Sequence, residues 1–244
     1  AWVVDETRTE AEDTYGPISS WDTSRIDDMS SLFADKTTFN GEIGGWDTSR
    51  VTRLIKTFYN TSSFSSQLAW DTSRVTIMRG TFRGAEGFNS ELEWDTSKVE
   101  TLGHTFYGCD AFNSKLAWDT SSVLTMTGTF YDAVAFIQPL DWDTSKVTTL
   151  ENTFRNATTF EQLLAWDTSA VTNMYYTFFR ANSFNSELVW DTSSVTTMQS
   201  TFREAEAFDA PLIWDWDTSK VTSMDSTFLD ATVFDRPLDW DTSK

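Results

Sequence analysis

Apolar residues recur along the chain in a long repeat, and each unit of the repeat begins at the tetrapeptide Trp-Asp-Thr-Ser. This tetrapeptide occurs ten times, and seven of the nine intervals between copies are 24 residues long, the first being 25 and the eighth 26. With Trp as position 0, position 5 is Val or Ile, position 8 is Met or Leu, and positions 12 and 18 are Phe in all nine complete units. Self-similarity at such a period is typical of a repeat solenoid.

The first half of each unit has the spacing of a helical face. Positions 5, 8, 12 and 15 are three or four residues apart, so a helix would place their side chains on one side. The preceding Asp-Thr-Ser is typical of a helix N-cap, where a side-chain oxygen accepts a hydrogen bond from a free backbone N–H. We therefore expect a helix from Ser97 to Cys109, then a short strand with Leu116 and Trp118 on its buried side. In a competing interpretation Val-Thr-x-Met is the strand, as over residues 171–174, but its Val and Met have the spacing of a helix.

Stacking of these units predicts the fold class, an α/β repeat solenoid with a leucine-rich-repeat-like coil. Each unit of about 24 residues would supply one short parallel strand and one short helix, with like residues stacked in columns. Strands about 4.8 Å apart would give ten coils a length of roughly 45 Å. We expect residues 1–20 to form an N-terminal cap, with a helix around Thr7 to Thr14. Residues 21–244 would form a solenoid of nine complete units plus the start of a tenth, whose uncapped end more protein or a partner would cover.

Composition narrows the classes of function. The chain is 39% hydrophobic, which is ample for a core, and its formal net charge of −19 argues against binding nucleic acid or an anionic membrane. It contains no apolar run long enough to span a membrane. Cys109 is the single cysteine, so no intrachain disulfide framework exists, and the expected place for its thiol is the core.

Two polar columns follow the repeat. An Asp at position 1 of every unit favours a structural role, tying down its own turn, over Ca²⁺ binding, because the tetrapeptide offers no second carboxylate. We therefore expect no cofactor, with Ca²⁺ as the alternative. Thr at position 11 suggests ice or small-ligand binding if its column is exposed, but a hydrogen bond back to a carbonyl is favoured because position 11 adjoins a buried Phe.

No enzyme chemistry stands out in the sequence. His104, the single histidine, has no nucleophile arranged around it, and we expect it on the surface. The one insertion in the repeat, Ile213-Trp214-Asp215, is too short to build a catalytic pocket. Two sequons, which begin at Asn60 and Asn156, are candidate N-glycosylation sites in a secreted protein.

The unit resembles the BspA-type, leucine-rich-repeat-like surface-protein repeat, with its pattern Trp-Asp-x-Ser-x-Val-Thr-x-Met and Phe-Asn-x-x-Leu. Residues 166–174 read Trp-Asp-Thr-Ser-Ala-Val-Thr-Asn-Met and residues 183–188 read Ser-Phe-Asn-Ser-Glu-Leu, and the resemblance covers residues 15–244. It implies an extracellular or cell-surface module for adhesion or architecture, which binds proteins, surface glycans or copies of itself, without catalytic residues. The expected partner surface is the set of outward positions beside the strand Leu, comprising Glu91, Glu93, Lys115, Asp141, Glu187 and Asp239.

Overall fold

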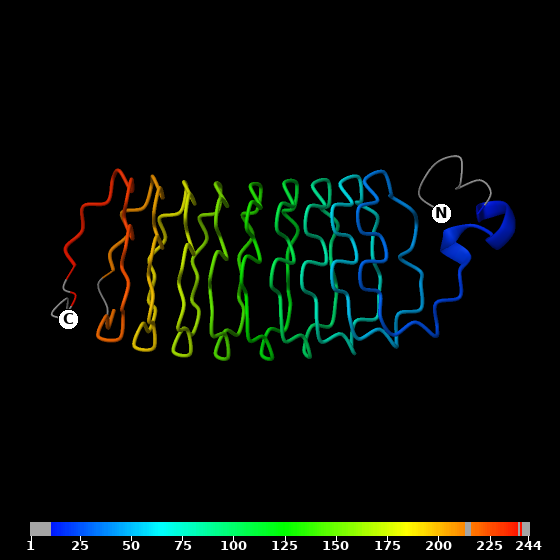
Figure 1. Ribbon diagram of the computed structural model, residues 1–244, viewed down its shortest axis with the longest axis horizontal. Helices are drawn as coiled ribbons and strands as arrows, with labels where there is room; N and C mark the ends of the chain where they lie inside the picture. Colours follow the sequence, from blue (N-terminus) through cyan, green and yellow to red (C-terminus); the bar gives the residue numbers. More distant parts are fainter. Residues whose placement is uncertain (1–10, 213–215, 239, 241–244) are drawn as a thin grey trace.

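The computed structural model describes residues 11–212, 216–238 and 240. Residues 11–15 are helical, in agreement with part of the expected N-terminal helix, and the 3-10 helix η1 spans Ile18–Ser20. From there each repeat unit makes one coil, and the coils lie side by side in chain order along the long axis (Figure 1). The N- and C-terminal units are thus at opposite ends of the stack.

The helix expected in each unit is absent from the described coils. Residues 97–109 form a series of turns instead. Two residues in this stretch, His104 and Gly108, have left-handed φ values of 57° and 66°, and the equivalent positions 10 and 14 are left-handed in the other coils. A left-handed residue breaks the run of right-handed dihedrals that a helix needs. The amide of His104 accordingly bonds the carbonyl of Thr127 on the next coil at 2.8 Å rather than a residue of its own turn.

Parallel β-bridges join the coils at position 7. The bridges run from Asp28↔Arg53 to Thr197↔Ser223, so pairing occurs within Val-Thr-x-Met, as the competing interpretation of the sequence has it. The strand expected around Leu116 and Trp118 is not formed, because no backbone N–H of residues 113–122 bonds a backbone carbonyl. Its predicted alternation is nevertheless present, since Leu116 and Trp118 are buried and Ala117 between them is exposed.

Aromatic columns fill the core, as the repeat pattern predicts. Within one coil the rings of Phe106 and Phe112 are stacked at 4.1 Å between centroids, and Phe106 stacks on Phe130 of the next coil at 5.7 Å. The indoles of Trp94 and Trp118 are parallel at 6.4 Å. Stacked aromatic pairs contribute about 0.5–1.5 kcal/mol each beyond the apolar area they bury, so the columns favour adding like coils to like. Buried Val, Met, Leu and Ala at positions 5, 8, 15 and 22 complete the core.

Side chains join the coils where the backbone does not. The indole N–H of Trp118 donates to the Leu92 carbonyl of the preceding coil at 3.2 Å. The Thr96 hydroxyl donates to the carbonyl of Asp119 on the following coil at 2.8 Å. Both bonds recur along the stack, but the buried indole N–H of Trp216, which follows the 26-residue interval, has no partner among the described residues.

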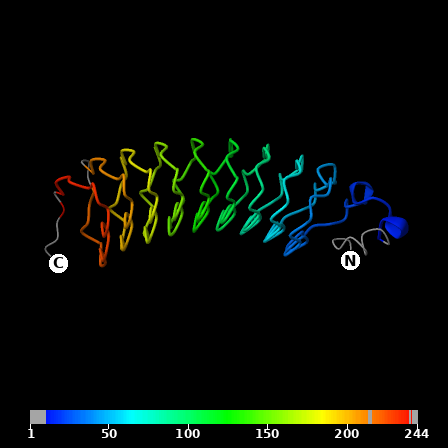
Figure 2. The same ribbon diagram turned by 90° about the horizontal axis from the view of Figure 1, so that it is seen from above.

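The stack is curved (Figure 2). Neighbouring rings are 5.7 Å apart at Phe106 and Phe130 but 6.1 Å apart at Trp118 and Trp142, so the coils are closer toward the hydrogen-bonded bridges. The bridged side is therefore the inner side of the arc. Two surfaces follow from this arrangement: the bridge face, formed by outward residues at positions 7, 9, 10, 13 and 14, and the Leu-Trp face, formed by outward residues at positions 19, 21 and 23.

Candidate interaction surface

The predicted partner residues lie on the Leu-Trp face. Positions 21 and 23 alternate with the buried Leu and Trp, and this alternation turns their side chains to solvent. Asp239 lies outside the described residues, and the other five are exposed, namely Glu91, Glu93, Lys115, Asp141 and Glu187.

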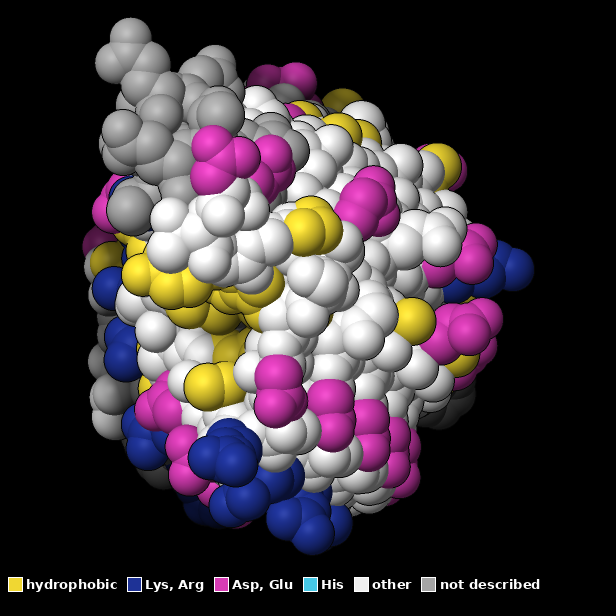
Figure 3. All heavy atoms as spheres, turned by 90° about the vertical axis from the view of Figure 1, so that its right-hand side faces the viewer, with side chains coloured by type: hydrophobic (Ala, Val, Ile, Leu, Met, Phe, Trp, Pro, Cys, Tyr) yellow, Lys and Arg dark blue, Asp and Glu magenta, His cyan; other side chains and the backbone are white. Residues whose placement is uncertain are grey.

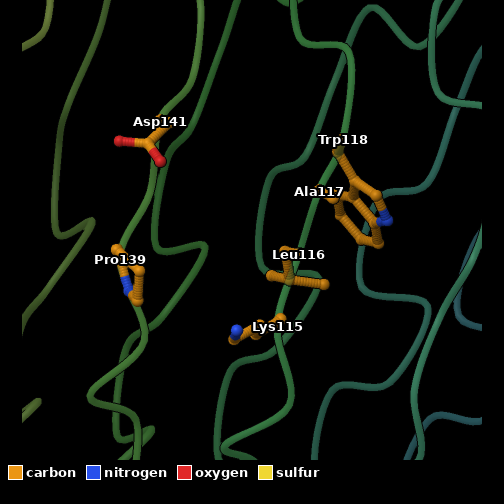
Figure 4. A pocket seen from close by; sticks show the side chains of 6 residues that line it. All are labelled: Lys115, Leu116, Ala117, Trp118, Pro139 and Asp141. Atoms are coloured by element: carbon orange, nitrogen blue, oxygen red, sulfur yellow. The ribbon is translucent and has the colours of Figure 1, made fainter.

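A hollow of about 410 Å³ lies on this face between two coils (Figure 4). Residues 115–118 line it from one coil, and Pro139 and Asp141 line it from the next. Leu116 and Trp118 supply an apolar lining, being 4% and 5% exposed. Lys115 and Asp141 bring opposite charges to the same hollow, and no salt bridge occupies either of them among the described residues.

The backbone beside the hollow also carries free polar groups. The N–H groups of residues 114–120 have no backbone partner, and the adjacent coils are instead linked through an Asn column. Asn89 Oδ1 accepts from the Asn113 amide at 2.7 Å, and Asn113 Oδ1 accepts from the Ile137 amide at 3.0 Å. A cation, a carboxylate, an apolar lining and free amides suit noncovalent recognition of a polar ligand or side chain.

The face changes in character along the stack. Glu91 and Glu93 precede the hollow, whereas Leu163 and Val189 on later coils are 63% and 65% exposed. The outward side chains at positions 21 and 23 thus vary between coils more than the buried residues do. This variation gives the face a sequence of acidic, mixed and apolar sites.

The Asp column at position 1 ties down turns. Asp143 Oδ1 accepts from the amide and hydroxyl of Ser145 at 3.0 and 2.7 Å, and these bonds hold the pKa of Asp143 below its usual range. From the N-terminal end of the stack, a row of acidic side chains recedes with Lys and Arg side chains beside it (Figure 3). The described residues contain no group of three or more His, Cys, Asp or Glu able to hold a metal ion. Nor does any described helix have the length and apolarity needed to cross a membrane.

The threonines at position 11 are buried and do not form an exposed surface. Thr105 is fully buried, and its hydroxyl lies 2.8 Å from the Leu102 carbonyl and 3.0 Å from the Met78 carbonyl of the preceding coil. Ice or ligand binding through this column was therefore the wrong alternative, because its hydroxyls link the coils inside the core. Several threonines at position 6 are exposed instead, for example Thr172 and Thr196, and the sequence interpretation missed them.

The two residues singled out as reactive types have packing roles. The thiol of Cys109 is buried and lies 3.0 Å from the Phe82 carbonyl, and burial raises its pKa. His104 is half-buried rather than a free surface residue, because its ring lies against Gly128, which has no side chain. Burial, followed by the charges of Arg83 and Arg79, lowers the pKa of His104.

Both sequon asparagines are at position 14 with left-handed backbones. Asn60 is exposed and its amide donates to Asp35 Oδ1 at 3.0 Å, whereas Asn156 is half-buried and its amide donates to Asp132 Oδ1 at 2.7 Å. Glycosylation of either residue stays a prediction, with Asn60 the more accessible acceptor.

Comparison with known proteins returns one family model. Three overlapping segments, residues 4–116, 91–189 and 161–244, match the model described as "Mycoplasma protein of unknown function, DUF285". Together they cover nearly the whole chain. No curated protein matches it.

Proposed function

The chain belongs to the DUF285 family, and from that premise we propose that it is a non-enzymatic repeat solenoid that binds partners through its Leu-Trp face. The main support is the hollow between two coils, in which Lys115 and Asp141 flank the apolar surfaces of Leu116 and Trp118. The varied outward residues lie on a core that repeats in each coil, so the surface can be specific without disturbing the fold.

The partners we propose are other proteins or surface glycans, copies of this chain included. A hollow with one cation, one carboxylate and free backbone amides would fit a polar side chain or a sugar with several hydroxyl groups. The resemblance to surface-protein repeats and the two sequons support an extracellular or cell-surface location for this binding. The repeat itself supports an adhesive or architectural role, since it extends one surface along the whole stack.

The proposal is tested by screening the purified chain against arrays of extracellular proteins and glycans. Hits are then repeated with the double variant Lys115→Ala/Asp141→Ala. A matched control is Lys146→Ala/Asp143→Ala, which removes the same two charges from exposed positions 4 and 1 of one coil, at residues that do not line the hollow. We expect ligands that the hollow variant loses and the control keeps. Hits that both variants retain, or none at all, would refute binding at the hollow.

A further inference from the structure

The central coils of the bridge face have a charge opposite to that of the chain as a whole, whereas the first and last coils add only acidic side chains to this face, at Asp28, Asp35, Asp225 and Asp230. In the coils that begin at Trp46 through Trp190, it carries seven basic and three acidic side chains, although the chain has a formal net charge of −19. Five of the six tyrosines are also on this face. Tyr and Arg are the residues most enriched at the energetic centres of protein interfaces.

The basic residues gather most densely on two neighbouring coils. Arg53 and Lys56 come from one coil, Arg79 and Arg83 from the next, and neither coil has an acidic residue on the bridge face. We call these four residues the cationic cluster. Arg53 Nε lies 3.7 Å from Asp28 Oδ2. The other three cations of the cluster form no salt bridge among the described residues. Lys56 and Arg79 are exposed, so their charges are available to a ligand.

Tyrosine rings contact two of the four cations of the cluster, Lys56 and Arg83. Arg83 lies 4.4 Å from the ring centroid of Tyr107 and 5.7 Å from that of Tyr59, and Lys56 Nζ lies 5.2 Å from the Tyr59 centroid. Cation–π contacts of this kind restrain flexible side chains before a ligand arrives, which reduces the entropy lost on binding. The cluster's own cations thus already contact the Tyr59 and Tyr107 rings. The groups left to a ligand are the N–H donors.

Three glycines lie near the cations, of which Gly80 and Gly103 are buried and Gly84 is half-buried. Gly80, Gly84 and Gly103 lie on the bridge face, and a Cβ on Gly80 or Gly103 would contact the side chain of Lys56 or Arg79, at 3.4 and 4.0 Å. The neighbouring His104 has a lowered pKa, caused first by burial and only then by the positive charges of Arg83 and Arg79. The result is a positively charged surface on which Ile55, Tyr59 and Ile77 are also partly exposed.

We propose that the cationic cluster binds an acidic peptide, an extended Asp- and Glu-rich segment of a partner protein. Guanidinium groups pair with carboxylates through two parallel N–H···O bonds, and Arg clusters are a recurring way to bind acidic motifs. Lys56 and Arg79 are exposed and supply most of the donors, and the half-buried Arg83 adds to the positive charge beside them. This surface is separate from the hollow, so either proposal can fail while the other stands.

The test uses fluorescence anisotropy with a labelled Asp/Glu-rich peptide and its Asn/Gln counterpart at low and physiological salt. The variant Lys56→Gln/Arg79→Gln removes two exposed charges of the cluster. Its control, Arg50→Gln/Arg74→Gln, removes two exposed charges from position 4 of the same two coils. We expect the cluster variant to bind the acidic peptide at least about tenfold more weakly, since two charge-assisted contacts are lost, and the control to bind almost as the parent does. The hollow variant Lys115→Ala/Asp141→Ala should also bind normally.

Several results would overturn the proposal. An equal loss of peptide affinity in the cluster variant and its control would mean that the peptide is attracted by nonspecific electrostatics and not by the cluster. Tighter binding of a carboxylated or sulfated oligosaccharide than of the peptide would assign the surface to a glycan. Self-association that the cluster variant abolishes, with no peptide binding, would assign it to a second copy of the chain.

Discussion

The indole N–H of Trp118 donates a hydrogen bond to the backbone carbonyl of Leu92 on the preceding coil at 3.2 Å. The same bond joins Trp46 to Ile18 and Trp190 to Leu164, so it recurs along the stack. Each such Trp therefore both packs in the core and links two coils on the side where their backbones are not bonded to each other.

The first prediction concerns this bond. Trp118→Phe should lower the free energy of unfolding by about 1–3 kcal/mol more than Trp216→Phe does, because the indole N–H of Trp216 has no partner to lose. Both indoles are similarly buried, at 5% and 6% exposed, so the apolar losses nearly cancel. Urea unfolding followed by far-UV circular dichroism measures both. Equal losses would show that the bond contributes nothing net.

A second prediction concerns the buried threonine column. Thr105→Val keeps the shape of the side chain but removes the hydroxyl that reaches Leu102 and Met78, so we expect a loss of about 1 kcal/mol. Thr172→Val, on the exposed position 6, should cost less because water can replace its bond. Chemical denaturation compares the two. A larger cost at Thr172 would contradict the role given to the buried column.

The third prediction concerns the thiol of Cys109. Burial raises its pKa, so at pH 8 the folded chain holds almost no thiolate, and a disulfide reagent such as Ellman's should react only as the chain unfolds in urea. Cys109→Ala should cost less than about 1.5 kcal/mol, because Ala occupies this buried position in the neighbouring coils at Ala85 and Ala133. Rapid labelling of the folded chain would contradict this.

Acid sensitivity supplies a fourth prediction. Hydrogen bonds from Ser145 hold the pKa of Asp143 below its usual range, so this carboxylate stabilises the fold above its unfolded pKa of about 3.9. That contribution is lost as the pH falls through the lower folded value, and the other position 1 aspartates with Ser partners add to the effect.

Ser145→Ala tests this coupling. It removes the largest cause of the shift, so the fall in unfolding free energy between pH 6 and pH 2.5 should be smaller than in the parent chain. Ser122→Ala is the control, because its hydroxyl bonds the Ser97 carbonyl and no carboxylate. A control that changes the pH dependence as much as Ser145→Ala would disprove the coupling.

The fifth prediction concerns Gly128. Its φ is +59°, and a Cβ there would lie 2.4 Å from His104 Nδ1, so Gly128→Ala should destabilise the chain by more than the roughly 1 kcal/mol of a left-handed alanine alone. In a His104→Ala background the same change should cost less, since the clash is gone. Thermal unfolding of the four chains gives the coupling. Additive costs would mean that the ring simply moves aside.

The sequence predicts the period and the buried columns well, because every core position repeats the same residue types. It fails on the helix, since apolar spacing alone cannot reveal the left-handed backbones at positions 10 and 14. A signal was present: Gly, Asn or Asp fills position 14 in seven of the nine units, and these residues tolerate that conformation best.

The same error concealed the cationic cluster. The helix expected over positions 5 to 15 does not predict that Lys56 and Arg83 share a surface with Tyr107, because these residues belong to different coils. Only pairing of the coils through their turns brings these side chains together. By contrast, exposure of Lys115 and Asp141 followed from simple alternation, whereas their meeting at one hollow depends on how neighbouring coils align.

Backbone bonding on one side only gives the stack a mechanical asymmetry. The bridged edge resists stretching because many hydrogen bonds between backbone groups would have to lengthen together, whereas the Leu-Trp edge is restrained by side-chain bonds such as those of Trp118, Thr96 and Asn89 and by ring contacts. Bending of the stack should therefore change the spacing between coils more at the Leu-Trp edge than at the bridged edge. A ligand that binds two neighbouring coils at this edge would reduce bending of the stack. Tension along the axis of the stack would separate the two coils and weaken the binding of that ligand.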